Sequence, residues 1–190
     1  MAADGISILV VCTANQCRSP LTAAALARRA AEADLPVVVT SAGIAALPGA
    51  LATPPTVDAG RRLGLDLSGH YATSLEPASV RDADLVIGLE RRHVQEIVLH
   101  DPRAFSRSFT LKELARRGAE VGPRADNQPV GEWLAEVHRG RRPTELLGAS
   151  RADDVDDPTG SRAVDHVTMA EEVDDLAQQI FALLYPTPER

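Results

Sequence analysis

The sequence of 190 residues has very few cysteines and no long hydrophobic run. Cys12 and Cys17 are the only cysteines and lie close together, which excludes a framework of disulfides between distant segments. No stretch reaches the roughly 18 to 20 apolar residues of a membrane-spanning helix, and the N-terminus lacks the basic-then-apolar pattern of a secretion signal. We therefore expect a cytoplasmic protein without a membrane partner, in which the two cysteines are reactive rather than structural.

A positive net charge and an abundance of aromatic residues are also missing. The formal net charge is −7, whereas a protein that binds nucleic acid normally carries a basic face, so a nucleic-acid partner is not expected. Aromatic residues make up only 3% of the chain, which limits any groove that recognises a ring by stacking. The length and the 44% of hydrophobic residues suit one globular domain over residues 1–190, and the oligomeric state is left open.

What the chain does have is a regular alternation of strand and helix patterns. Apolar runs at 6–11, 37–40, 83–89 and 107–111 predict buried parallel strands. Helical spacing, caps and prolines predict helices between and after them, over 21–33, 53–63, 90–99, 112–118, 132–138 and 165–184, with Ser19 as the N-cap of the first. The alternation predicts a three-layer α/β sandwich around a mainly parallel, four-stranded sheet, with an extended loop and helix region over 103–156.

The loop after the first predicted strand holds the residues best suited to chemistry, because ligands of such sheets bind at the carboxyl ends of the strands. Cys12 and Arg18 lie at its two ends, in a turn from strand to helix. Such a turn points several backbone N–H groups inward, and the helix dipole adds partial positive charge, so it suits an anion such as phosphate. Arg18 can add two parallel hydrogen bonds to phosphate oxygens, and the same donors favour the nucleophilic thiolate of Cys12.

Each of these residues also has an ordinary structural interpretation. Alone, Cys12 would be a buried cysteine at a strand end, and Arg18 a surface residue at a helix start. A phosphate-binding loop is favoured once they are combined with their neighbours in this position, Asn15, Ser19 and Pro20. Cys17 keeps two interpretations: a small packed side chain, or a thiol that traps an oxidised Cys12 as a reversible disulfide.

The loop resembles that of the low-molecular-weight protein tyrosine phosphatase family. Residues 12–20 read C-T-A-N-Q-C-R-S-P, and the family's loop has the form C-x-G-N-x-C-R-S-P after the first strand. The resemblance extends, in the family's order, to residues 41–43, 66–70 and 83–87 and to the pair Asp157-Pro158. The run at 109–113 is similar to a bacterial branch of actinobacterial type.

The resemblance implies a two-step phosphoryl transfer that needs neither metal nor cofactor. Cys12 would attack phosphorus, while Arg18 holds the phosphate oxygens. The carboxylic acid of Asp157 would give a proton to the departing oxygen and later take one from the water that attacks the phosphocysteine. Pro158 biases Asp157 to an extended backbone and stiffens its loop. Without the upstream loop, this acidic turn (Asp153, Asp154, Asp156 and Asp157) would be interpreted as a solvated surface.

The resemblance also implies supporting roles for the rest of the site. Backbone amides would bind phosphate along the loop, which consists of Thr13, Ala14, Asn15, Gln16, Cys17, Arg18 and Ser19. Ser19 would donate a hydrogen bond to the Cys12 sulfur. Asn15 would take a left-handed backbone conformation, which Asn tolerates better than most residues. The matching members of the network that holds it are Ser41 and His70.

Several positions depart from the family's pattern. Ala14 replaces the loop glycine, and Gln16 stands where tyrosine phosphatases often have Ile or Leu and arginine phosphatases have Thr. The wall that commonly carries Trp aligns with the small segment 44–47, and Thr159 replaces the aromatic residue after Asp-Pro. The substrate therefore stays open between a phosphorylated protein, with phosphotyrosine first, and a small phosphomonoester.

Two other functions fit parts of the pattern. An arsenate reductase on the same fold also attacks with a loop cysteine; its thioredoxin-coupled form needs two further cysteines that the chain lacks, whereas a form coupled to a small thiol stays open. The third alternative is a catalytically weak phosphate-binding or scaffold protein. The combination of Cys12, Arg18 and Asp157 favours the phosphatase over both.

Overall fold

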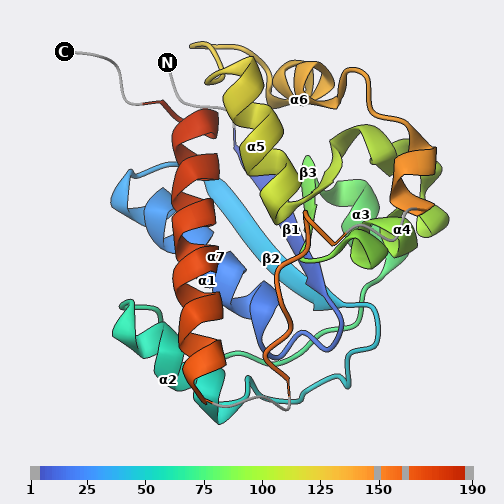
Figure 1. Ribbon diagram of the computed structural model, residues 1–190. Coiled ribbons are helices and arrows are strands. Elements are labelled where there is room, and N and C mark those ends of the chain that lie inside the picture. The colour runs from blue at the N-terminus through green and yellow to red at the C-terminus, as the bar shows by residue number, and fades with distance from the viewer. Residues whose placement is uncertain (1–4, 148–150, 160–162, 187–190) are drawn as a thin grey trace.

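The computed structural model describes residues 5–147, 151–159 and 163–186, which fold around a four-stranded parallel sheet (Figure 1). The strands are β1 (Ile6–Cys12), β2 (Val37–Gly43), β3 (Leu85–Gly88) and β4 (Ser108–Thr110), in the spatial order β2-β1-β3-β4. Each neighbouring pair is parallel. The fold class predicted from the alternation of strands and helices is confirmed.

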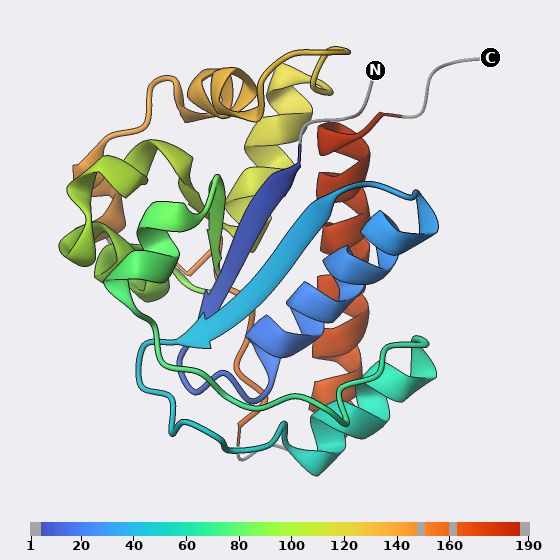
Figure 2. The same ribbon diagram turned by 180° about the vertical axis from the view of Figure 1, so that it is seen from behind.

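Helices cover both faces of this sheet. They are α1 (Arg18–Glu32), α2 (Pro54–Arg62), α3 (Pro77–Asp82), α4 (Arg91–His100), α5 (Leu111–Val121), α6 (Val130–His138) and α7 (Ala163–Leu184), with the 3-10 helices η1 (Pro102–Arg107) and η2 (Pro143–Leu147). Side chains alternate along β1, so Ile8 and Val10 join the core under α1, α5 and α7, whereas Leu9 and Val11 join a second core under α3 and α4. Figure 1 shows the first face, and Figure 2 shows the second from behind. No helix in the described part of the chain is long and apolar enough to cross a membrane.

The start of α1 differs from the prediction. Ser19 is not the N-cap: α1 begins at Arg18, and its N-cap is Cys17, which makes no capping hydrogen bond with its side chain. The hydroxyl of Ser19 instead lies 2.9 Å from the sulfur of Cys12. The first N–H groups of α1 are therefore not used by a side-chain cap, as an anion site requires. The three short helices α3, η1 and η2 were not predicted from the sequence, because each has too few residues for a helical period.

The carboxyl ends of β1, β2 and β3 meet at one edge of the sheet, where the loops approach closely. Cys12 pairs with Gly43 in the register of β1 and β2. A Cβ atom on Gly43 would lie 2.6 Å from the carbonyl oxygen of Thr13, which is closer than atoms can pack, so this position requires glycine. The segment after β2 also bonds to the loop, because Ile44 N–H donates to the Cys12 carbonyl at 3.0 Å. The loop of Cys12 is thus held by two strands.

Candidate active site

Cys12 ends β1 at the mouth of the predicted phosphate-binding loop. Its side chain is buried, and its sulfur lies 3.3 Å from the backbone nitrogen of Asn15 and 2.9 Å from the hydroxyl of Ser19. An N–H and an O–H that both face the sulfur stabilise a thiolate more than a thiol, since a thiolate is the stronger acceptor. The loop therefore directs an N–H and a hydroxyl at the sulfur of Cys12.

Asn15 fixes the shape of this loop through its side chain and its backbone. Its φ is 54°, the left-handed conformation that the family resemblance implied. The amide Nδ2 donates to Ser19 at 2.9 Å and to Ser41 at 2.8 Å, while Oδ1 accepts the Thr73 N–H at 2.8 Å. The Asn15 carbonyl lies 2.6 Å from Nε2 of His70; a carbonyl only accepts, so Nε2 carries the proton. The structure thus brings Ser41 and His70 to Asn15.

Arg18 lies across the loop from Cys12 in a buried position, with 2% of its side chain exposed. Its Nη1 donates to a carboxylate oxygen of Glu90 and, at 3.0 Å, to the carbonyl of Val155. Its Nη2 donates to Oδ2 of Asp157 at 2.6 Å. A buried guanidinium needs such partners, since an unpaired charge in the interior is costly. Glu90 holds one edge of Arg18 in place, and Asp157 occupies an edge that a phosphate group can use.

Asp157 is the member of the acidic turn that reaches Arg18. Its Oδ1 accepts two hydrogen bonds from Thr159, from the backbone N–H at 2.9 Å and from the hydroxyl at 2.6 Å. Burial raises the pKa of Asp157, but the bonds from Thr159 and the charges of Arg18 and Arg92 outweigh it, so the pKa lies below its ordinary value. In the free protein Asp157 is therefore ionised at neutral pH.

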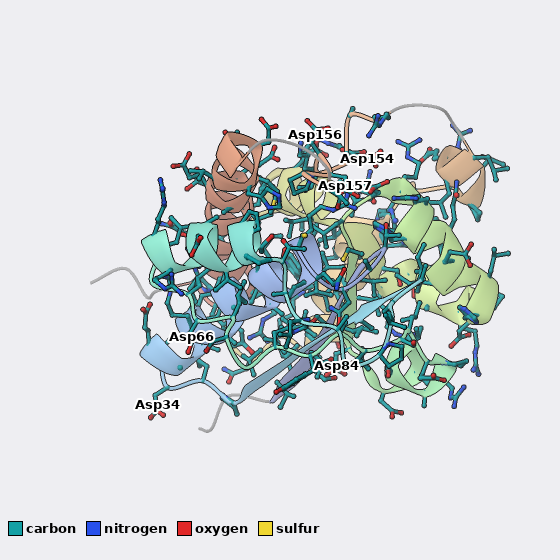
Figure 3. The ribbon with its side chains drawn as sticks, turned by 90° about the horizontal axis from the view of Figure 1, so that it is seen from below. Asp34, Asp66, Asp84, Asp154, Asp156 and Asp157 are labelled. Atoms are coloured by element: carbon teal, nitrogen blue, oxygen red, sulfur yellow. The ribbon has the colours of Figure 1, made fainter. Side chains whose placement is uncertain are left out.

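The other carboxylates of this turn point to different partners. Figure 3 shows Asp154, Asp156 and Asp157 on one stretch of chain. Asp154 accepts the backbone N–H of Arg91 at 2.8 Å, and Asp153 pairs with Arg116 at 3.5 Å. The turn does not gather its carboxylates around one point: no group of three or more His, Cys, Asp or Glu within residues 5–147, 151–159 and 163–186 could hold a metal ion.

Sequence reasoning missed three residues that follow β3, namely Glu90, Arg92 and His93. Glu90 and His93 form a capping box at the start of α4. Glu90 is buried and bonds to both Arg18 and Arg92. Burial lowers the pKa of His93 to about 3, so the ring is neutral at physiological pH. The spacing of an acid and a histidine directly after a parallel strand could have indicated them, because this strand ends beside β1.

The side chain of Cys17 contacts Thr53, the N-cap residue of α2. Both cysteines are free thiols, and the sulfur of Cys17 is 3.3 Å from the hydroxyl of Thr53. The Thr53 hydroxyl is hydrogen-bonded to the hydroxyl of Thr56 at 2.9 Å, and the Thr56 hydroxyl is hydrogen-bonded to Nδ1 of His166 at 3.0 Å. Cys17 is thus packed at the end of a chain of hydrogen bonds that joins α1, α2 and α7. A disulfide with Cys12 on oxidation stays a prediction.

The side chain of Gln16 bonds to a segment that carries an exposed pair, Leu51 and Tyr71. The side-chain amide of Gln16 donates to the carbonyl of Leu51 at 3.1 Å, and Leu51 pairs with Tyr71 in an antiparallel bridge. Residues paired in this way have neighbouring side chains, and both are exposed, at 58% and 63%. The sequence pattern gave no reason to expect an aromatic residue here. The bridge places Tyr71 beside Leu51, in the segment that bonds to Gln16.

Comparison with known proteins decides the family. The family model described as low molecular weight phosphotyrosine protein phosphatase matches residues 7–121. The chain belongs to this family. It is 37% identical over 135 residues to the probable low molecular weight protein-tyrosine-phosphatase EpsP of Ralstonia solanacearum, which covers 70% of this chain and 90% of that one. It is also 37% identical over 108 residues to the protein-arginine-phosphatase of Bacillus subtilis, covering 57% of this chain and 71% of the relative.

Solved structures agree with the family assignment. A mutant of YwlE from Bacillus subtilis superposes with a TM-score of 0.68 at 27% identity, covering 93% of this chain and 96% of that one. A low molecular weight protein tyrosine phosphatase from T. tengcongensis gives a TM-score of 0.68 at 25% identity, covering 92% and 97%. The phosphatases of this family are cysteine-dependent, so the chain is a phosphomonoester hydrolase of the low molecular weight type that acts through a phosphocysteine. The comparisons favour this activity over arsenate reduction and over a scaffold.

Proposed function

We propose that the protein hydrolyses phosphotyrosine in proteins, with Cys12 as nucleophile, Arg18 as phosphate clamp and Asp157 as general acid. The observation that carries the proposal is the ion pair of Arg18 and Asp157 at 2.6 Å, which joins two residues 139 positions apart over the loop of Cys12. A nucleophile, a two-pronged anion clamp and a proton donor are the groups that phosphoryl transfer to cysteine needs.

The first step replaces one anion by another. A phosphate dianion that enters the loop takes the donors of Arg18 and displaces the Asp157 carboxylate. Its negative charge raises the proton affinity of Asp157, which then carries a proton in the complex. The Cys12 thiolate attacks phosphorus; a P–S bond forms, the P–O bond to the tyrosine breaks, and the Asp157 proton goes to the phenolate oxygen.

The second step returns the site to its starting state. The Asp157 carboxylate takes a proton from water as the water oxygen attacks phosphorus, the P–S bond breaks, and inorganic phosphate leaves. The hydroxyl of Ser19, 2.9 Å from the sulfur, donates to the departing thiolate and lowers its energy. Asn15 keeps this geometry, because its amide also bonds the Ser19 oxygen, at 2.9 Å.

Two observations favour phosphotyrosine as the substrate group. A phenol leaves more readily than an alkyl alcohol, and the exposed pair of Leu51 and Tyr71 beside Gln16 offers an apolar contact for a ring. We place the activity in the cytoplasm, because a free, buried Cys12 that must act as a thiolate needs a reducing compartment.

Kinetics on three peptides of one sequence that carry phosphotyrosine, phosphoarginine or phosphoserine test the proposal. We expect the highest kcat/KM for the phosphotyrosine peptide, and a phosphoenzyme that acid quench traps in the wild type but not in Cys12→Ala. A preference for the phosphoarginine peptide would overturn the substrate assignment and leave the mechanism standing. Hydrolysis by Cys12→Ala at the wild-type rate would overturn the mechanism.

A further inference from the structure

A cluster of four residues lies at the rim of the phosphate-binding loop, on the side of α4. This rim cluster consists of Thr13, Glu90, Arg92 and His93. Glu90 and His93 are buried, whereas 51% of the Arg92 side chain is exposed. Arg92 is anchored at two points: Nε donates to Glu90 at 2.7 Å, and Nη2 donates to the hydroxyl oxygen of Thr13 at 2.8 Å. The guanidinium is therefore held one residue away from the nucleophile Cys12.

The rim cluster has hydrogen-bond donors that the fold does not use. Among the described residues, no hydrogen bond satisfies Nη1 of Arg92. Nδ1 of His93 accepts the Glu90 N–H at 2.9 Å, so its proton sits on Nε2, which donates to Thr13 Oγ1 at 3.0 Å. The Thr13 oxygen thus accepts from both His93 and Arg92, and its own O–H remains as a donor. Nη1 of Arg92 and the hydroxyl of Thr13 are therefore two donors next to the phosphate loop that a substrate group can use.

The charges at the rim also favour an anion. Two guanidinium groups share the one carboxylate of Glu90, since it bonds Arg18 as well as Arg92. His93 is neutral and adds no charge. When a phosphate group binds Arg18, it replaces the Asp157 carboxylate as the anionic partner of that guanidinium. The positive charge of Arg92 is then still available to a second anionic group.

A groove that Asp157 itself lines has the reverse sign. Its other carboxylates are Asp156, from the same turn, and Asp165 and Glu172, from α7. Glu172 pairs with Lys112 at 2.7 Å, and Asp156 and Asp165 are exposed. An acidic group on a substrate is repelled there and attracted at the rim cluster. The entrance therefore has a charge polarity that orients a bound segment.

We propose that Arg92 is a specificity-determining residue that binds an acidic side chain next to the phosphotyrosine of the substrate. The inference rests on the proposed function, because it assumes that the phosphoryl group sits on a protein segment. Arg92 contacts the neighbouring carboxylate through Nη1, and the Thr13 hydroxyl supplies a second donor. Because the two sides of the entrance differ in charge, an acidic residue is favoured on one side of the phosphotyrosine only.

Three phosphotyrosine peptides test this assignment: one with Asp before the phosphotyrosine, one with Asp after it, and one with Asn at both places. For the wild type at low ionic strength we expect one Asp peptide to exceed the Asn peptide in kcat/KM by about three- to tenfold, a usual size for a partly exposed charge pair. Salt should reduce this ratio. Arg92→Gln should bring it to about one, and Arg92→Lys should keep part of it.

The ratio of two peptides on one variant is the informative quantity, because Arg92 also supports Glu90 and its loss can lower turnover of every substrate. Arg103→Gln is the matched control, because it removes the same charge at another exposed arginine. The Arg103 side chain is 82% exposed and pairs with Asp101 at 3.1 Å. The ratio in this variant should equal that of the wild type. An equal ratio in wild type and Arg92→Gln overturns the inference while leaving the proposed function intact. If p-nitrophenyl phosphate is hydrolysed but none of the phosphopeptides is, the proposed function fails and the inference fails with it.

Discussion

Oδ2 of Asp157 lies 2.6 Å from Nη2 of Arg18, so the proposed general acid and the proposed phosphate clamp are ion-paired with each other. The carboxylate takes a donor that phosphate also needs. In the proposed mechanism, binding of substrate breaks this pair, and the same displacement frees Asp157 to take up a proton. One contact couples occupancy of the clamp to readiness of the acid.

Asp157→Asn should change binding and turnover in opposite directions. The neutral amide competes less well for Arg18 and no longer repels a dianion, so inorganic phosphate should inhibit with a lower inhibition constant. Turnover of aryl phosphates with poor leaving groups should fall by about two to four orders of magnitude, the usual range for a lost general acid. Inhibition constants and kcat values measured on the same preparation check both effects.

Asp156→Asn is the control for that variant, because Asp156 is exposed and precedes Asp157 directly. It removes the same charge from the same turn and should leave kcat close to the wild-type value. If Asp156→Asn instead showed the larger loss of kcat, the general acid would have been assigned to the wrong carboxylate.

Cys12→Ser should abolish turnover but keep the anion site. The backbone N–H groups of the loop and the guanidinium of Arg18 do not depend on the sulfur, so titration calorimetry should still detect binding of phosphate. Cys17→Ser is the comparison, since the sulfur of Cys17 faces Thr53 and not the reacting atoms. It should retain most of the activity. Equal loss of turnover in both variants would contradict the assignment of a single nucleophile.

The order of strands and helices and the reactive loop could be predicted from the sequence because they depend on local patterns. The apolar run before Cys12, the prolines at helix starts and the C-x5-R spacing are each visible within a few residues. The prediction failed where a side chain has two competing uses. Ser19 is a good N-cap by type, yet its hydroxyl bonds Cys12 and Asn15, and the helix begins before it.

Long-range pairings could not be obtained in the same way. Glu90 holds Arg18 across 72 positions of sequence, and Tyr71 lies beside Leu51 through their antiparallel bridge. The local signal, an acid and a histidine three residues apart after β3, indicates a helix cap and not a partner for Arg18. Only the pairing of β1 with β3 places it beside the loop, so topology has to be known before this residue can be interpreted.

Arg141 should be a major determinant of stability in the region between β4 and the acidic turn. Its side chain is 2% exposed, pairs with Glu113 at 2.8 Å, and lies over the rings of Phe105 and Phe109. Arg141→Met should lower the free energy of unfolding by about 3 to 5 kcal/mol, because it leaves a partly buried carboxylate without its partner. Denaturant unfolding measures the loss.

Arg142→Met provides the matched control for that measurement. The neighbouring Arg142 is 77% exposed and pairs only loosely with Glu145, at 3.4 Å. Its substitution should change the free energy of unfolding by less than about 0.5 kcal/mol, as for most surface positions. If both variants lost the same free energy of unfolding, the stability would depend on the charge of this segment and not on the buried pair of Arg141 and Glu113.

The last prediction concerns the hydroxyl of Thr159, which donates to Oδ1 of Asp157 at 2.6 Å. Hydrogen bonds from Thr159 to the ionised carboxylate help to hold the pKa of Asp157 below its ordinary value, against the opposing effect of burial. Thr159→Val removes the hydroxyl bond and keeps the backbone bond, so the pKa of Asp157 should rise. General acid catalysis requires the protonated form and is lost as pH rises through this pKa. The alkaline limb of kcat/KM for an aryl phosphate with a poor leaving group should therefore move to higher pH in Thr159→Val. Thr159→Ser keeps a hydroxyl and should restore the wild-type profile, and a limb that stays in place in Thr159→Val would show that the hydroxyl does not tune the acid.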